Sequence, residues 1–226
     1  MADRPFVLRY YPSEKIFHAI NAICWAFLIY TGLCTYFHWV GPDTAAVYMR
    51  LHVVVAILFT LNLVGFILLA PDRALIMLQS LLRWDRNTFA WYRNLGGYPR
   101  KLFGIDFGPK ELAPQGRYNG GQKPIYLYFL TSQWVLAITG WTTYLLVPAI
   151  PKVGTSWMHS LHLWFAITAT LLVVVIHIPL AFINWEFFKG IWRIGPGSLP
   201  MDVAKEEMSQ WVAEDIIPVK PLPAAE

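Results

Sequence analysis

Four histidines lie inside the long apolar segments of this chain, at positions that could pair across helices. His18 and His52 each lie near the start of an apolar segment, and His162 and His177 lie near the two ends of another. An ionisable side chain at membrane depth is costly, so it is by default a functional hypothesis. Four imidazoles that can pair in two sets indicate two bis-histidine haem sites and transfer of electrons across a bilayer.

Four membrane-spanning helices of an all-α bundle are expected to position these histidines. A spanning helix needs about 20 mostly apolar residues, and four segments qualify: 16–39, 47–69, 124–147 and 156–188. The fourth is longer than a bilayer requires, and Pro179 should kink it and free a backbone carbonyl near His177. Residues 1–194 would form one membrane domain, followed by a polar cytoplasmic tail over 195–226.

Composition supports the membrane class. Charged residues make up 14% of the chain, against about 25% in soluble domains. Basic residues do not alternate with aromatic ones on a soluble face, so no nucleic-acid partner is expected. Cys24 and Cys34 form neither CxxC nor CxxCH, which argues against a thioether-linked haem, an iron–sulfur cluster or a zinc site in this chain.

Loop charges predict the orientation of the bundle. The loop over 71–122 carries eight basic residues, the N-terminal tail adds three, and the C-terminal end adds Lys189, Arg193, Lys205 and Lys220. The two short loops on the other side carry only Lys152. The positive-inside rule then puts both termini and the long loop in the cytoplasm.

This orientation sets the depth of each histidine. His18 would lie near the inner face, and His52 and His162 near the outer face. His177 follows His162 by fifteen residues, which is about 22 Å along a helix. The expected pairs are His18 with His177 and His52 with His162, each on one six-coordinate haem that is suited to electron transfer.

Two side chains near the outer pair have open assignments. His159 lies three residues before His162, and it could replace His162 as a ligand or act as a propionate or proton partner. We favour His162 because it lies deeper. Arg50 could pair with a haem propionate, or could extend its side chain to the membrane surface.

The long loop and the tail have weaker patterns. Residues 74–91 (ALIMLQSLLRWDRNTFAW) carry apolar residues at helical spacing, which predicts an amphipathic helix on the membrane surface or under the bundle. Residues 96–121 are rich in Gly and Pro and should be irregular. The tail from Gly195 is expected to be a docking strap or a loose end.

The stretch RYNGGQK (117–123) precedes the third helix, and Pro124 suits a first helical turn. The side chains of Asn119 and Gln122 and the backbone around Gly121 could bind a ligand carbonyl at a helix N-terminus. A quinone carbonyl would fit such a pocket, and a simple turn is the alternative interpretation.

The order of these features resembles the cytochrome b (gamma) subunit of membrane-bound respiratory formate dehydrogenase. The similar stretches are EKIFHAI, MRLHVV, RYNGGQK and LHLWFA…VIHIPLAF, and the resemblance covers most of residues 10–190. The histidines are shared with a wider group, which includes cytochrome b subunits of nickel–iron hydrogenase and of thiosulfate-reductase-like complexes.

The resemblance implies a multi-pass protein of the bacterial cytoplasmic (inner) membrane with two haems b. By resemblance, the axial ligands are His18, His52, His162 and His177, and Asn119 and Gly121 contact menaquinone. The implied partners are an iron–sulfur subunit at the outer face and, through it, a molybdopterin or tungstopterin catalytic subunit. The complex could form a higher oligomer.

The leading interpretation is a membrane-anchoring electron-transfer subunit that carries the quinone-reaction site, with formate oxidation as the partner reaction. A quinol-oxidising subunit of a sulfur-compound reductase and a hydrogenase cytochrome b are alternatives in the same class. A haem-free anchor and a histidine-based transporter or proton channel are alternatives of other classes. The channel would need further acidic groups at mid-membrane depth.

Overall fold

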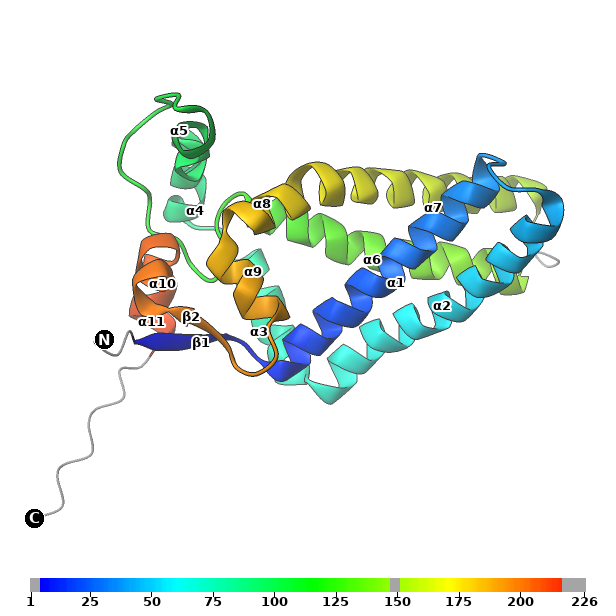
Figure 1. Ribbon diagram of the computed structural model, residues 1–226, viewed down its shortest axis with the longest axis horizontal. Helices are drawn as coiled ribbons and strands as arrows, with labels where there is room; N and C mark the ends of the chain where they lie inside the picture. The colour runs from blue at the N-terminus through cyan, green and yellow to red at the C-terminus, as the bar shows by residue number, and fades with distance from the viewer. Residues whose placement is uncertain (1–4, 147–150, 217–226) are drawn as a thin grey trace, which may run out of the picture. The chain divides into compact units, whose positions relative to one another are not determined.

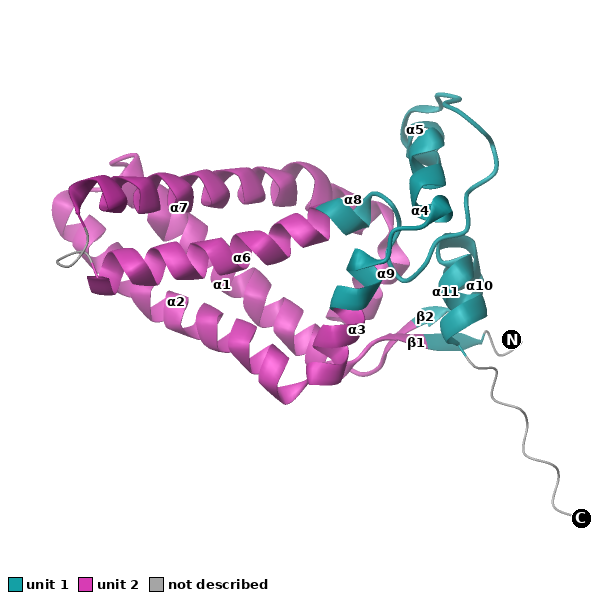
Figure 2. Cartoon of the chain, turned by 180° about the vertical axis from the view of Figure 1, so that it is seen from behind, with its two compact units in different colours: residues 1–7, 78–124, 199–226 teal, residues 8–77, 125–198 magenta. Residues whose placement is uncertain are grey.

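The computed structural model describes residues 5–146 and 151–216. The chain divides into two compact units, which have different colours in Figure 2. The helical unit comprises residues 8–77 and 125–198, and the loop unit comprises residues 1–7, 78–124 and 199–226. The four histidines expected to bind haem belong to the helical unit, whereas the RYNGGQK turn belongs to the loop unit.

Two long helices begin the helical unit. α1 (Pro12–Tyr36) and α2 (Pro42–Leu69) lie side by side and run in opposite directions (Figure 1). Each begins with a proline, whose missing N–H costs nothing in the first helical turn. They therefore begin four to five residues earlier than the predicted segments 16–39 and 47–69.

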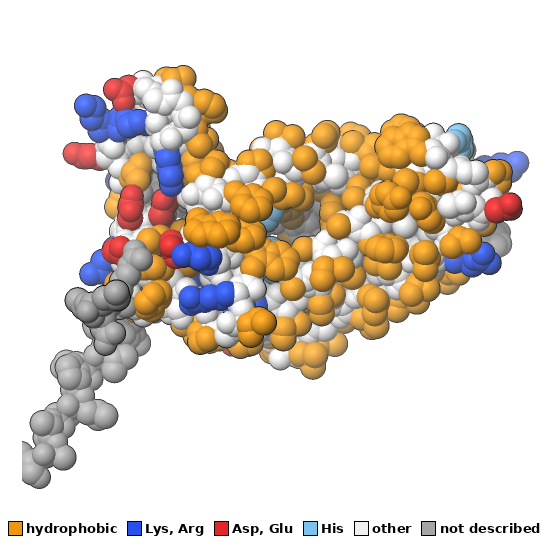
Figure 3. All heavy atoms as spheres, in the orientation of Figure 1, with side chains coloured by type: hydrophobic (Ala, Val, Ile, Leu, Met, Phe, Trp, Pro, Cys, Tyr) orange, Lys and Arg blue, Asp and Glu red, His pale blue; other side chains and the backbone are white. Residues whose placement is uncertain are grey.

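Among the described residues, three helices are long and apolar enough to cross a membrane: Pro12–Tyr36, Pro42–Leu69 and Lys152–Ile183. Apolar side chains cover most of the visible face of the helical unit, and its charged side chains lie near the ends of its helices (Figure 3). Three of the predicted spans are thereby confirmed by length and composition.

The remaining predicted span, 124–147, corresponds to α6 (Gln122–Leu146), which is not among those three helices. α6 is long enough, but it carries buried polar side chains: Ser132, Gln133 and Thr139. The number of four membrane spans therefore stays a prediction.

The helix that carries His162 and His177 is not uniform. α7 (Lys152–Leu172) continues into the π-helical turn η4 (Val173–His177) and then into α8 (Ile178–Ile183). The N–H of Ile178 donates to the carbonyl of Val173, five residues earlier. Pro179 cannot donate a backbone hydrogen bond, and a wide turn of this kind is a known response to such a break. The kink expected at Pro179 is realised as this π turn.

The same helix ends earlier than predicted. Asn184 leaves helical geometry with φ −96° and ψ 63°, and α9 (Trp185–Trp192) then follows as a separate helix. The predicted end at Phe188 is therefore wrong, because apolar periodicity continues through α9 even though the backbone breaks before it.

The amphipathic helix predicted over 74–91 is confirmed up to Leu82, but its predicted extent is wrong. α3 (Pro71–Leu82), which crosses the boundary between the units, ends before α4 (Arg86–Ala90) begins. The Asp85 side chain accepts a 2.8 Å hydrogen bond from the Thr88 N–H, so it caps a new helix within the expected one.

The Gly- and Pro-rich stretch contains more structure than expected. Its start belongs to a short 3₁₀ turn, Leu95–Gly97, which leads into α5 (Tyr98–Phe103). Another 3₁₀ turn, Trp91–Arg93, precedes the stretch. The chain is irregular after Phe103 until α6 begins.

The described part of the tail is folded. β2 (Gly197–Pro200) pairs with β1 (Phe6–Tyr10), and α10 (Met201–Glu207) and α11 (Ser209–Asp215) follow. In the loop unit, the N–H of Gln210 donates to the Gln115 carbonyl at 3.0 Å, and Arg83 forms a 2.8 Å ion pair with Glu214. These contacts favour the docking strap over the loose end.

Candidate haem sites and the loop-to-helix turn

His18 and His177 face each other in the helical unit. His18 lies in the second turn of α1, and His177 is the last residue of η4. Their ring centres are 6.2 Å apart, and the ring planes are inclined by 45°. Both side chains are half-buried.

His52 and His162 form the second pair. His52 lies on α2, and His162 lies on α7, with ring centres 6.4 Å apart and planes inclined by 55°. His159 is exposed, one turn earlier on α7. The structure therefore brings His162, rather than His159, opposite His52.

Both separations match two imidazoles on opposite sides of one metal ion. Because a metal–imidazole bond is about 2 Å long and the ring centre lies roughly 1 Å behind the nitrogen, opposed ligands have ring centres about 6 Å apart. The two pairs, at 6.2 Å and 6.4 Å, could each hold one six-coordinate iron.

Two threonines contact the second pair and were missed by the sequence analysis. Thr31 Oγ1 lies 2.9 Å from His52 Nδ1, and Thr139 Oγ1 lies 3.0 Å from His162 Nδ1. Each threonine precedes a glycine in an apolar helix. That repeated Thr-Gly dipeptide was the available signal, but a threonine in an apolar helix usually suggests only packing.

Aromatic rings surround the first pair. Trp192 meets the His18 ring edge-on at 5.2 Å, and Phe129 meets the His177 ring edge-on at 5.9 Å. The Lys15 Nζ donates to the carbonyl of Arg193 at 2.6 Å, which ties the end of α9 to the start of α1. α9 thus holds Trp192 against His18.

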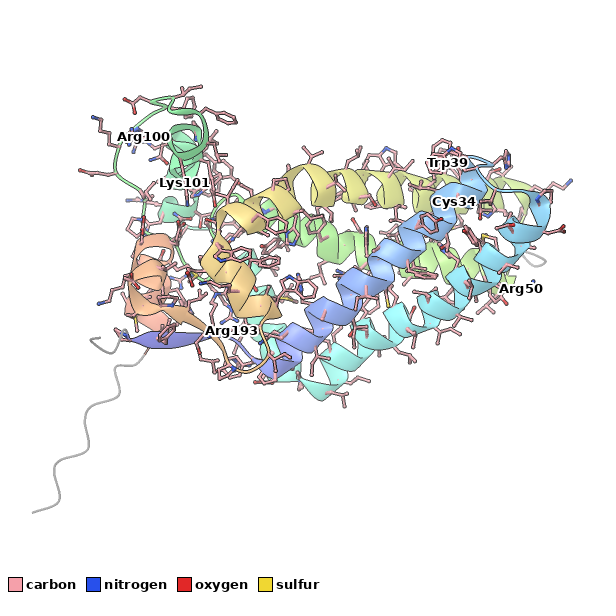
Figure 4. All side chains as sticks on the ribbon, viewed as in Figure 1. Cys34, Trp39, Arg50, Arg100, Lys101 and Arg193 are labelled. Atoms are coloured by element: carbon pink, nitrogen blue, oxygen red, sulfur yellow. The ribbon has the colours of Figure 1, made fainter. Side chains whose placement is uncertain are left out.

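Arg50 is exposed on α2, and His38 is exposed beyond α1. Figure 4 places Arg50 and Trp39 at the end of the helical unit where α1 and α2 are joined, and Arg193 at the opposite end. A role of Arg50 at a haem propionate stays a prediction.

In the loop unit, RYNGGQK folds into a hydrogen-bonded turn. Asn119 Oδ1 accepts from the N–H of Gly121 at 3.0 Å and of Gln122 at 2.9 Å, and Gln122 Oε1 accepts from the Asn119 N–H at 3.1 Å. The backbone N–H groups of Asn119, Gly121 and Gln122 are therefore bonded within the turn, as in a helix cap. Quinone contact by Asn119, Gly121 and Gln122 stays a prediction.

The last residue of the motif before Pro124 is also engaged within the loop unit. The Lys123 side chain is 3% exposed, and its Nζ donates to the Arg83 carbonyl at 2.5 Å and to Thr88 Oγ1 at 2.6 Å. Burial acts to raise the pKa of Asp85, but the Thr88 and Gln210 hydrogen bonds and the Lys123 charge outweigh it and hold that pKa below its usual value. This network fixes the loop to the start of α6.

We expect Gly121→Ala to destabilise the loop unit by about 1–3 kcal/mol, because overfilling a packed site has that cost. A Cβ at Gly121 would overlap the Trp91 ring, whereas a Cβ at Gly116 meets nothing within 4 Å. Limited proteolysis should therefore cut the 71–122 loop faster in Gly121→Ala than in the matched control Gly116→Ala. Equal cleavage of the two variants would contradict this packing role.

Comparison with known proteins identifies a family over a range that includes the helical unit up to residue 197. A family model described as prokaryotic cytochrome b561 matches residues 9–197, which is most of the chain. No curated protein matches the chain. The matched range contains both histidine pairs and the three apolar helices. It supports a b-type cytochrome of a bacterial membrane without selecting the formate dehydrogenase gamma subunit. The chain therefore belongs to the prokaryotic cytochrome b561 family of membrane proteins that bind haem b.

Proposed function

We propose that this chain is a di-haem b electron-transfer subunit that connects an iron–sulfur partner to the menaquinone pool. The observation that carries the proposal is the pair of histidine couples, 6.2 Å and 6.4 Å between ring centres, at two levels of one helical unit. A membrane chain with one such couple would carry a single redox centre, whereas two couples provide two redox centres between which electrons can pass.

The side chains fit the group that the family implies. His18 and His177 would hold one haem, and His52 and His162 the other, which leaves no open iron position for oxygen chemistry. Gly140 leaves space for the His162 ring, because a Cβ at this position would lie only 3.2 Å from His162 Cε1. A bound haem b supplies a reversible one-electron carrier, and the protein supplies ligands, an apolar surrounding and position.

Haem stoichiometry tests this proposal directly. A pyridine haemochrome assay on the purified chain should give two haems b per polypeptide, and a redox titration should resolve two components. Ferric low-spin signals without a high-spin signal would match bis-histidine ligation. One haem per chain would contradict electron transfer between two haems, and a colourless protein would favour the haem-free anchor.

We propose that α6 is the fourth span and that both termini are cytoplasmic. The eight basic residues in 71–122, against one in the two short loops, support this orientation. Single-cysteine variants in a Cys24→Ser/Cys34→Ser background would test it with a membrane-impermeant thiol reagent on intact cells. A cysteine at Asp43 should react, and a cysteine at Lys110 should not; the reverse pattern would overturn the orientation.

We propose that the RYNGGQK turn binds the quinone through Asn119. Asn119→Asp keeps the oxygen that caps Gly121 and Gln122 but removes the amide donor, so it separates a ligand role from a turn role. We expect Asn119→Asp and Asn119→Ala to retain both haems and to lose menaquinone-analogue affinity to a similar extent, about tenfold for one lost hydrogen bond. Unchanged affinity in Asn119→Asp would assign the motif to structure alone.

The catalytic partner proposed is formate dehydrogenase-like, with a periplasmic iron–sulfur subunit and a molybdopterin or tungstopterin subunit beyond it. Support comes from the RYNGGQK resemblance, while a hydrogenase or a sulfur-compound reductase remains the competing partner. Purification of the tagged chain from its own membranes should recover an iron–sulfur subunit and formate-dependent haem reduction. Hydrogen-dependent reduction would select the hydrogenase, and haem oxidation by a sulfur compound would select the reductase.

A further inference from the structure

The hydrogen-bond pattern of Thr31 favours one protonation of the His52 ring. Thr31 Oγ1 lies 2.9 Å from the carbonyl of Phe27 on its own helix and 2.9 Å from His52 Nδ1 on α2. A hydroxyl has one proton, and the carbonyl can only accept it. With its proton on the Phe27 carbonyl, the hydroxyl oxygen is an acceptor toward the imidazole. Nδ1 would then carry the ring proton, and Nε2 would keep its lone pair.

Thr139 repeats this pattern on the other side of the same couple. Its Oγ1 lies 2.6 Å from the Val135 carbonyl and 3.0 Å from His162 Nδ1. By the same proton count, His162 also presents an unprotonated Nε2. Metal-bound histidines ordinarily have their second nitrogen fixed in this way by an outer partner.

The residue after each threonine is a glycine against the same imidazole. A Cβ at Gly32 would lie 3.3 Å from His52 Cε1, and a Cβ at Gly140 would lie 3.2 Å from His162 Cε1. The same Thr-Gly pair therefore occurs on α1, against His52 of α2, and on α6, against His162 of α7. In each Thr-Gly pair the threonine hydroxyl contacts Nδ1 of one imidazole, and the glycine backbone lies close to the same ring.

The other couple is supported differently. His18 Nδ1 is buried and, within the described part of the chain, lacks a hydrogen-bond partner. Its ring instead packs edge-on against Trp192, while Tyr126 and Phe129 lie edge-on to His177. The hydroxyl acceptors are thus a feature of the His52–His162 couple.

We propose that Thr31 and Thr139 are positioning residues that fix the Nε2 tautomer of His52 and His162 and lower the reduction potential of the haem between them. An imidazole that donates from Nδ1 is a stronger electron donor through Nε2, and stronger donation favours ferric over ferrous iron. This inference rests on the proposed function, because it requires haem at this couple.

Thr31→Val and Thr139→Val test the proposal, since valine keeps the shape and removes the hydroxyl. Each should retain two haems and shift the same redox component to higher potential. At a fixed ambient potential, the ferrous-to-ferric ratio of that component should rise roughly two- to fivefold, which corresponds to part of one net hydrogen bond. The double variant should shift it further, and the second component should not move.

Thr60→Val is the matched control. Thr60 also bonds to its own helix, at the Ala56 carbonyl, and accepts from a ring N–H across helices, but that ring is Trp141. It should leave both potentials unchanged. Thr31→Ser and Thr139→Ser keep the hydroxyl and should restore the wild-type potential, with the ferric low-spin spectrum as an independent readout.

The outcomes separate the two proposals. Wild-type protein with fewer than two haems would overturn the proposed function, whatever the variants do. Two haems with unchanged potentials and spectra in both valine variants would overturn the role of the threonines alone. Shifts in different components would also overturn it, because the two threonines would then serve different haems.

Discussion

His52→Ala should reduce the haem content of the purified chain from two haems per polypeptide to one. His52 lies opposite His162 at 6.4 Å, and no other histidine is paired with it in the described structure. Removal of one of two axial ligands leaves a haem held from one side in a widened site. The redox titration should then lose one component and keep the other, and the pyridine haemochrome assay measures the stoichiometry.

His159→Ala is the control for this prediction. His159 is exposed and lies one turn from His162 on the same helix, so its loss should leave two haems. A loss of haem in His159→Ala with full content in His162→Ala would transfer the ligand role to His159. Full haem content in His52→Ala would contradict the proposal that His52 and His162 hold a haem.

Sequence spacing predicted the histidine couples because helical geometry fixes depth and face over long apolar segments. His18 and His52 lie near opposite membrane faces if their helices run in opposite directions, and the α1–α2 hairpin provides that arrangement. Fifteen residues along α7 and η4 then place His177 level with His18. The rise per residue was sufficient for this inference.

The supporting residues could not be predicted in the same way. Thr31 and Thr139 form their imidazole contacts across helices, 21 and 23 positions away in the chain, and the spacing of one helix contains no information about such contacts. Trp192 meets the His18 ring from a separate helix, α9. Its contact with His18 depends on the break at Asn184, which apolar periodicity does not reveal.

The loop unit departs from its prediction for a local reason. Asp85 interrupts an amphipathic pattern, and its side chain accepts from both the backbone and the hydroxyl of Thr88. A capping residue within a periodic segment divides it into two helices, although the hydrophobic period remains unbroken. The function of the turn at Asn119 is likewise not readable from the sequence alone, because capping and ligand binding require the same residue types.

His177→Ala should separate the two redox centres by function. One haem per chain should remain, at the His52–His162 couple, and menadiol should no longer reduce it. The reason is that the proposed quinone reaction occurs at the side of the membrane where His177 lies. In wild-type membranes menadiol should reduce both components, so the loss is measured as the extent of haem reduction at equal quinol concentration.

Two further measurements make this result specific. Dithionite should still reduce the remaining haem in His177→Ala, which shows that the second couple is intact. Added imidazole should restore both the missing haem spectrum and reduction by menadiol, because a free imidazole can occupy the space left by the side chain and ligate the iron opposite His18. Normal menadiol reduction in His177→Ala with one haem would place the quinone reaction at the His52–His162 couple, and the electron path proposed here would then run in a different order.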